Sequence, residues 1–264
     1  MIAFSKEHET FLKKKKKNKT IILLSQITIV ILFLITWQLL SSLKIINTFL
    51  FSSPKNMISC IIKLYKSNDL FENILITSYE VIISFVLANI IGFIIGSILW
   101  WNKTLAKILD PFLTVLNSLP KVALGPLIII WVGASTKSII FMALMISGII
   151  SIINIYNSFK STNNNYIMLM KTFNSTKFQI YKKVIIPANI NSIINNFKIN
   201  ISMTLIGVIM GELLVSKNGL GYLIMYGSQI FNIDLVITSV FILGVLSYIL
   251  YYLICIIEKK LIKN

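Results

Sequence analysis

Six apolar stretches constrain the fold of this 264-residue chain more than any other feature. They lie at Thr20–Leu43, Ile74–Trp101, Pro111–Gly133, Ser138–Phe159, Ile193–Val215 and Asp234–Ile257. A helix of about 20 apolar residues spans roughly 30 Å of hydrocarbon. Because lipid offers backbone groups no hydrogen-bond partner, each stretch should be helical. The sequence therefore predicts an all-α membrane protein with about six transmembrane helices.

The positive charge of the chain is better explained by membrane topology than by nucleic-acid binding. The formal net charge is +16, and all 25 basic residues are lysines. With the N-terminus inside, 17 lysines fall in cytoplasmic segments and 6 in outside segments, while Lys121 and Lys198 fall within spans. Cytoplasmic loops carry an excess of lysine and arginine in membrane proteins. We therefore expect both termini in the cytoplasm, contact with membrane lipid, and no nucleic-acid partner.

The domain organisation predicted from this pattern is simple. Residues 1–19 form a cytoplasmic polybasic tail, and residues 20–264 form one transmembrane domain. The lysine run Lys13–Lys17 precedes an apolar stretch that is too long for a signal peptide. We therefore expect an uncleaved membrane anchor.

A polar, lysine-bearing segment of about residues 165–187 separates two of the spans. Its central part reads KTFNSTKFQIYKKVIIPANI, from Lys171 to Ile190. Tyr166–Phe173 can form a short helix. Asn174 can end that helix, because asparagine tolerates a left-handed backbone better than any residue except glycine. The first half of the segment is therefore predicted to be a helix followed by a tight turn.

A second short helix is predicted directly after this turn. Thr176 and Gln179 have the spacing of a capping box, which starts a helix. Pro187 is expected to mark the next break. The apolar residues on one face of this helix are Phe178, Tyr181 and Ile185. Such a helix can rest on lipid headgroups or dock in the groove of a cytoplasmic partner, and the spacing leaves both readings open.

The segment resembles the EAA loop of ABC importer permeases. That pattern is roughly Glu-Ala-Ala, three residues, Gly, about nine residues, and then Ile-x-Leu-Pro. Asn174 stands at the glycine, and Ile185-Ile186-Pro187 stands at the end of the pattern. The Glu-Ala-Ala positions read Met168-Leu169-Met170, so the acidic residue is missing.

Other parts of the chain are similar to the nitrate, sulfonate and taurine type of these permeases. Leu109–Gly133 is similar to their third span, Ser78–Leu99 to their second, and Gly211–Ile224 to the region after their fifth. The likeness runs in order from about Ser53 to the C-terminus. Glu80 departs from the pattern, which usually carries a basic residue there.

The resemblance implies a type I ABC importer permease in a bacterial inner membrane. It also implies a homodimer, separate cytoplasmic ATP-binding subunits, and an extracytoplasmic substrate-binding protein. The solutes of the family include sulfonates, taurine, nitrate and thiamine-type precursors. Residues 165–187 would then hold the coupling helices that seat in the ATPase. The residues expected to make this contact are Thr172, Phe173, Asn174, Ser175, Thr176, Phe178, Tyr181 and Pro187.

The chain itself is not expected to be an enzyme. It has no phosphate-loop motif for ATP, no HExxH and no CxxC, so we expect neither a cofactor nor a metal. An integral membrane enzyme would need acid–base or nucleophilic groups clustered at one depth. The alternative from another class is a non-transporting scaffold or a decayed permease, which the missing acidic residue of the EAA loop keeps open.

Small residues recur every four positions on two of the predicted spans. Such residues let helix backbones approach closely in lipid. They can pack helices within one subunit or form a dimer seam, and the first reading is favoured. The residues are Ser84, Ala88, Gly92 and Gly96 on the second span, and Gly207 and Gly211 on the fifth.

Polar residues inside the spans are candidates for the translocation path, because such residues usually face a bundle interior or water. Asn196, Asn200 and Thr204 form a stripe on the fifth span, for which interhelical hydrogen bonding is an equal alternative. Lys121 can line the path of an anion or snorkel to the interface. Glu212 can help to hold an outer gate or pair with a loop lysine such as Lys217 or Lys137.

Overall fold

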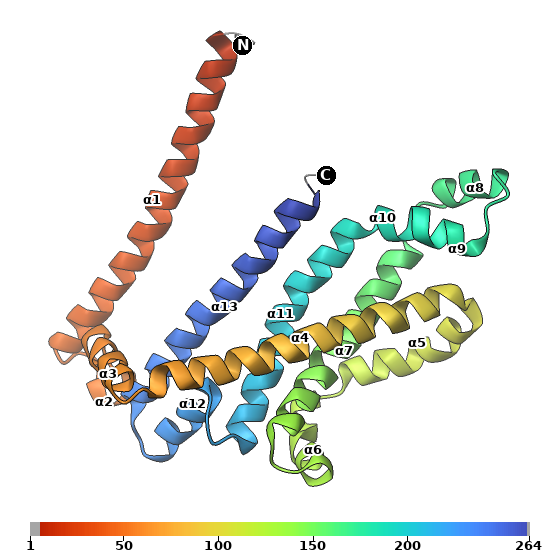
Figure 1. Ribbon diagram of the computed structural model, residues 1–264. Coiled ribbons are helices and arrows are strands. Elements are labelled where there is room, and N and C mark those ends of the chain that lie inside the picture. Colours follow the sequence, from red (N-terminus) through yellow and green to blue (C-terminus); the bar gives the residue numbers. More distant parts are fainter. Residues whose placement is uncertain (1–5, 263–264) are drawn as a thin grey trace.

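The computed structural model describes residues 6–262, and every regular element in this range is a helix (Figure 1). Residues 1–5 of the predicted tail and Lys263 lie outside the described residues. The elements are α1 (Lys6–Ser42), α2 (Thr48–Phe51), α3 (Pro54–Lys66), α4 (Asp69–Trp101), α5 (Lys103–Ser118), η1 (Lys121–Leu124), α6 (Gly125–Val132), α7 (Thr136–Lys160), α8 (Asn164–Thr172), α9 (Lys177–Ile180), η2 (Tyr181–Ile185), α10 (Ile186–Ala188), α11 (Ile190–Val215), α12 (Leu220–Gln229) and α13 (Ile233–Ile262).

Five of the described helices are long and apolar enough to cross a membrane: α1 from Thr20 onward, α4, α7, α11 and α13. The predicted third span, Pro111–Gly133, is not one continuous helix. The chain there forms α5 and then η1 with α6, bent by 84°. Leu119 has an extended backbone with ψ of 139°, as expected for a residue before proline. The all-α prediction is confirmed, with six spans only if this bent pair counts as one.

α7 is the central helix, and it packs against both α4 and α11. Small residues permit this close approach. A Cβ added at Gly207 would stand 2.5 Å from the Cα of Ala143, and one at Gly92 would stand 2.1 Å from the Oγ of Ser151. The Ser84–Gly96 stripe of α4 and the glycines of α11 therefore face α7 or the interior of the same chain.

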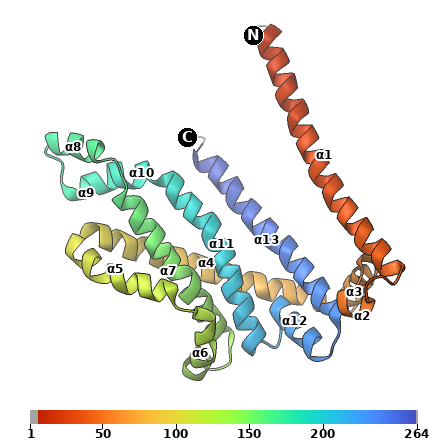
Figure 2. The ribbon, with the colours of Figure 1, turned by 180° about the vertical axis from the view of Figure 1, so that it is seen from behind.

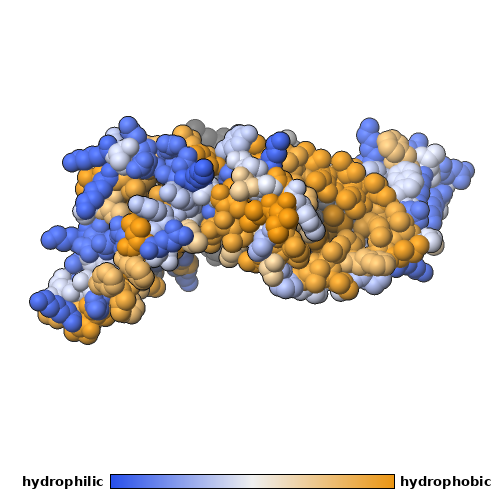
Figure 3. Space-filling view, turned by 90° about the horizontal axis from the view of Figure 1, so that it is seen from below, coloured by the Kyte–Doolittle hydropathy of each residue, from blue (hydrophilic) through white to orange (hydrophobic). Residues whose placement is uncertain are grey.

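The bundle has two distinct ends. The start of α1, the end of α13 and the segment α8–α10 lie on one side, while α2, α3, α6 and α12 lie on the other (Figures 1 and 2). Asp234 at the start of α13 accepts hydrogen bonds from Ser52 Oγ (2.5 Å) and Asn56 Nδ2 (3.2 Å), which fixes α3 at the second side. Many large apolar side chains remain exposed on the membrane-length helices, and apolar residues also cover much of the face seen from below (Figure 3).

α1 stands apart from the rest of the bundle. Its described apolar side chains are largely exposed, and it packs against α3 near its C-terminal end. There Gln38 Oε1 accepts a hydrogen bond from the Lys55 backbone N–H at 3.1 Å. The helix begins at Lys6, so the described part of the predicted tail is helical.

Candidate functional site

The polar segment between α7 and α11 forms the predicted helix, turn and helix. Asn163 caps α8 by accepting a hydrogen bond from the Asn165 N–H at 2.9 Å. At the other end Asn174 has φ of 50°, in the left-handed region, and the Ser175 N–H bonds to the Met170 carbonyl at 3.1 Å. The first bond satisfies a backbone N–H, and the second a carbonyl, that the helix ends would leave unpaired. The prediction that Asn174 ends the first helix is confirmed.

The second helix begins at the predicted capping box. The Gln179 N–H donates to Thr176 Oγ1 (3.3 Å), and the Thr176 N–H donates to Gln179 Oε1 (2.8 Å). α9 then widens into the π-helical turn η2 and continues as α10. The break expected at Pro187 lies two residues later, at Asn189, because proline is tolerated in the first turn of α10.

One side of this segment is packed into the bundle. Ile180 and Ile185 are buried against Ile155 and Phe159 of α7, and Ile167 and Met170 of α8 lie against the same cluster. The predicted apolar face of the second helix, formed by Phe178, Tyr181 and Ile185, therefore does not point in one direction. One part anchors the segment to α7, and the rest faces outward.

An aromatic cluster joins the segment to the end of α4. The Tyr181 ring lies 5.3 Å from that of Trp100 and 6.0 Å from those of Trp101 and Phe159, between centroids. The Tyr181 hydroxyl hydrogen-bonds with Ser97 Oγ at 2.6 Å. Sequence analysis missed this cluster, although two tryptophans at the end of a span are typical of a membrane interface.

Lys177 strengthens the same junction. Its ammonium group donates to the Trp101 carbonyl and lies 5.8 Å and 5.2 Å from the ring centroids of Trp100 and Trp101. A cation above an aromatic face is attracted by the ring quadrupole. α9 is therefore fixed to α4 by a cation as well as by ring contacts.

The two ends of the segment are tied together by one side-chain pair. Asn189 Nδ2 donates to Thr162 Oγ1 at 2.6 Å and to the Ile185 carbonyl at 2.8 Å. Both side chains are buried. Because Thr162 follows α7 and Asn189 precedes α11, the segment is closed at its base.

The outer side of the segment presents apolar side chains. Phe173 is 72% exposed and Phe178 is 60% exposed, beside exposed Tyr166, Met168 and Leu169. Of the other residues predicted to contact an ATPase, Thr172, Asn174, Thr176 and Pro187 are exposed, while Ser175 and Tyr181 are half-buried. The predicted contact residues thus lie mainly on one accessible end, with Tyr181 turned inward.

The polar stripe of α11 is enclosed by neighbouring helices. Asn196 donates to Asn89 Oδ1 (3.3 Å) and to Ser151 Oγ (3.0 Å), and Asn200 donates to Asn89 Oδ1 (3.0 Å). Thr204 bonds to the Asn200 carbonyl at 2.8 Å. These contacts are what interhelical hydrogen bonding requires, and a role of the stripe in a path stays a prediction.

Glu212 lies in the last turn of α11, the helix whose first turn follows the α8–α10 segment, and it is 1% exposed. Its Oε1 accepts from Thr77 Oγ1 at 2.7 Å, and its Oε2 accepts from the Gly221 N–H at 2.6 Å. It is thus held by a hydroxyl and a backbone N–H, not by a loop lysine. The carboxyl group of Glu80, also 1% exposed, contacts Glu212, and its Oε2 has no hydrogen-bond partner.

Lys121 lies in η1, at the bend between α5 and α6. Its ammonium group donates to the carbonyl oxygen (3.0 Å) and the side-chain Oδ1 (3.3 Å) of Asn117. The lysine therefore caps the end of α5, near which cations are favoured. Its predicted role in a path is not tested by this contact.

Comparison with known proteins decides the family. The family described as "Binding-protein-dependent transport system inner membrane component" matches residues 88–263. The chain belongs to this family of ABC importer permeases. It is therefore a multi-pass inner-membrane permease subunit of a binding-protein-dependent importer, in which a separate subunit hydrolyses ATP.

Two of three similar proteins have a solute in their names, and the two solutes differ. A probable ABC transporter permease of Haemophilus influenzae is 27% identical, with 87% of this chain and 93% of the relative covered. The putative aliphatic sulfonates permease SsuC of Bacillus subtilis is 25% identical, covering 86% and 82%. The formylaminopyrimidine permease ThiX of Halalkalibacterium halodurans is 26% identical, covering 73% and 76%.

A solved structure has the same fold as this permease. The MetNI methionine ABC transporter in an inward-facing conformation superposes with a TM-score of 0.64 at 18% identity. The match covers 71% of this chain and 94% of the matched chain. The predicted type I importer fold is thereby confirmed.

Proposed function

We propose that this permease works as a homodimer, with two cytoplasmic ATPase subunits and an extracytoplasmic binding protein, to import a small solute. The candidate solutes are sulfonates, taurine, nitrate and thiamine-type precursors. The names of the SsuC and ThiX relatives support this range. The chain makes no covalent bond, and it alternates access by rocking its spans.

The α8–α10 segment is the observation that carries the proposal. It has an inner side fixed to α4 and α7 and an outer side with exposed Phe173 and Phe178. Exposed aromatic side chains next to polar ones are typical of binding surfaces. A partner that holds the outer side would move α4 and α7 through the inner side.

This role also sets the orientation of the chain. ATPase subunits are cytoplasmic, so the side with α8 and α9 faces the cytoplasm. The start of α1 and the end of α13 lie on that side (Figure 1). The excess of lysines in the same segments supports both termini being inside.

The coupling proposal is tested by Phe173→Ala with Phe178→Ala. Because both rings are exposed, the double variant should keep the thermal stability of the chain. Co-purification of the ATPase from the native membrane should fall at least tenfold, since aromatic anchors carry much of the energy of an interface.

Phe49→Ala is the control, because Phe49 is 59% exposed on α2 at the opposite end of the bundle. It should leave ATPase recovery unchanged. Full recovery of an ATPase with the double variant would contradict the assigned surface. A wild-type chain that recovers no ATPase even after crosslinking would favour a non-transporting scaffold.

A further inference from the structure

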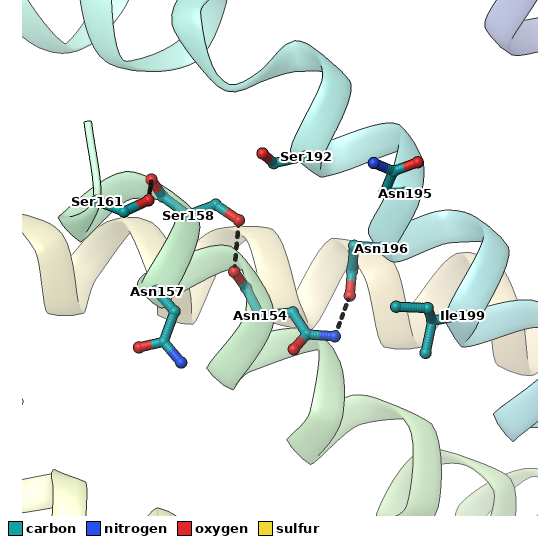
Figure 4. A pocket seen from close by; sticks show the side chains of 8 residues that line it. All are labelled: Asn154, Asn157, Ser158, Ser161, Ser192, Asn195, Asn196 and Ile199. Atoms are coloured by element: carbon teal, nitrogen blue, oxygen red, sulfur yellow. Dashed lines mark hydrogen bonds between the residues drawn. The ribbon is translucent and has the colours of Figure 1, made fainter. Parts of the chain in front are cut away.

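A groove of about 400 Å³ opens between α7 and α11, at the end of the bundle nearest α8 and α9 (Figure 4). This volume is in the range of small-molecule sites. Seven of its eight lining side chains carry an amide or a hydroxyl group. The lining residues are Asn154, Asn157, Ser158, Ser161, Ser192, Asn195, Asn196 and Ile199.

The floor of the groove is fixed by hydrogen bonds. Asn154 Nδ2 donates to Asn196 Oδ1 at 3.0 Å. Asn196 Nδ2 in turn donates to Asn89 of α4 and Ser151 of α7, in the interior of the bundle. Ser158 Oγ donates to the Asn154 carbonyl at 2.7 Å. Because these side chains are already held in place, binding a ligand would not cost the conformational entropy of ordering them.

The walls carry polar groups that are free. Among the hydrogen bonds of residues 6–262, none engages the side chains of Asn157, Ser192 or Asn195, which lie on opposite helices (Figure 4). An asparagine amide presents a donor and an acceptor side by side. The free groups therefore match a solute that has both kinds of group adjacent on one edge.

The groove has no cation to offer an anion. The two lysines next to its lining residues are engaged elsewhere. Lys198 forms an ion pair with Glu258 at 2.7 Å, and Lys160 lies over the Tyr156 ring at 5.6 Å. An anion that leaves water without a positive partner loses much of its hydration energy. An uncharged solute does not carry this cost.

We propose that this groove binds a small, uncharged solute with adjacent hydrogen-bond donors and acceptors, of the aminopyrimidine kind, on its way through the permease. The inference rests on the proposed importer function and narrows its solute class. Asn157, Ser161 and Asn195 are exposed, so the groove is open to water, which is consistent with an aqueous path along α7 and α11.

The test measures binding to the purified permease–ATPase complex without the binding protein. The probes are an aminopyrimidine, an alkanesulfonate and nitrate, each at neutral pH, followed by ligand-observed NMR. The aminopyrimidine should bind best. Asn157→Leu with Asn195→Leu should weaken its binding about tenfold or more, because two polar contacts are lost. Gln229→Leu changes an exposed amide at the end of α12, outside both the groove and the coupling segment, and should have no effect.

A variant that gains binding of another solute shows that loss of aminopyrimidine binding is not caused by misfolding. Asn195→Lys should weaken aminopyrimidine binding and raise alkanesulfonate binding, because it supplies the missing cation. The inference is overturned if the sulfonate or nitrate binds the wild type best. It is also overturned if no aminopyrimidine binds, or if the leucine variants bind it normally.

ATP-driven uptake by vesicles that contain the full complex separates this inference from the importer function. Uptake of a sulfonate, without aminopyrimidine binding, would refute the solute class and leave the importer intact. Absence of ATP-driven uptake of every probe, in vesicles that contain the full complex, would refute the importer function itself.

Discussion

At the scale of single residues, the closest helix contact gives a clear test of packing. Gly207→Ala would place its Cβ 2.5 Å from the Ala143 Cα, so α11 must move away from α7. We expect a loss of about 1–3 kcal/mol, as for other overpacked cores. A melting curve in detergent measures it.

Gly148→Ala is the matched control on α7, because its Cβ would meet nothing within 4 Å. Alanine is also a better helix former than glycine by about 1 kcal/mol. The control should therefore be neutral or stabilising. If both variants lost the same stability, Gly207 of α11 would not be in close contact with Ala143 of α7.

The buried carboxyl pair predicts opposite effects for two similar substitutions. Glu80 and Glu212 repel each other when both are ionised, and Glu80 Oε2 is unpaired. Glu80→Gln cannot ionise beside Glu212 and can donate to it at every pH, so the melting temperature should rise at alkaline pH, where both carboxyl groups of the wild type are ionised. Glu212→Gln gives up an acceptor oxygen used by Thr77 or Gly221, and should cost about 1–2 kcal/mol. A stabilising Glu212→Gln would contradict the contacts described for this site.

At the scale of elements, the Tyr181 cluster predicts how motion passes from the coupling segment to α4. Tyr181→Ala removes the ring contacts with Trp100 and Trp101 and the bond to Ser97. The ATPase should still bind, because the outer side is unchanged, but solute uptake per ATP hydrolysed should fall severalfold.

Tyr181→Phe is the control for the ring, since it loses only the hydroxyl bond, worth about 1 kcal/mol. It should retain most of the uptake per ATP. Normal coupling in Tyr181→Ala would show that the cluster anchors the segment without transmitting its movement.

The sequence predicted the helix ends that are determined by neighbouring residues. The left-handed backbone of Asn174 ends α8, and the capping box of Thr176 and Gln179, three residues apart, begins α9. The bend before Pro120 also has a local cause, but its 84° angle depends on what α5 and α6 pack against.

Partners far apart in sequence could not be predicted from one chain. Asn89 and Asn196 lie 107 residues apart, and Thr77 and Glu212 lie 135 apart. Only the packing of α4, α7 and α11 brings them together. For the same reason the sequence identified the α11 stripe but not the groove beside it.

At the scale of the whole molecule, the two ends of the bundle predict the topology. In a chain with Cys60→Ser and Cys255→Ser, an introduced Ser175→Cys should react with an impermeant maleimide only from the cytoplasmic side. Lys217→Cys, in the loop after α11, should react only from outside. Labelling of both from one side would refute the orientation.

Cys60 adds little background to such an experiment even when it is retained. Burial raises the pKa of its thiol, so the reactive thiolate is scarcer at neutral pH than in an ordinary cysteine. Labelling of the native thiol should therefore increase as the pH rises above neutrality.

The separation of α1 from the bundle has a consequence for biosynthesis. This helix is synthesised before α4, and its exposed apolar surface can enter lipid before α4 exists. α4 is different, because Asn89 Oδ1 accepts hydrogen bonds from Asn196 and Asn200 of α11, and the Glu80 carboxyl group contacts Glu212 of the same helix. α1 can thus enter the membrane without the helices that follow it, while α4 must wait near the insertion machinery until α11 has been made.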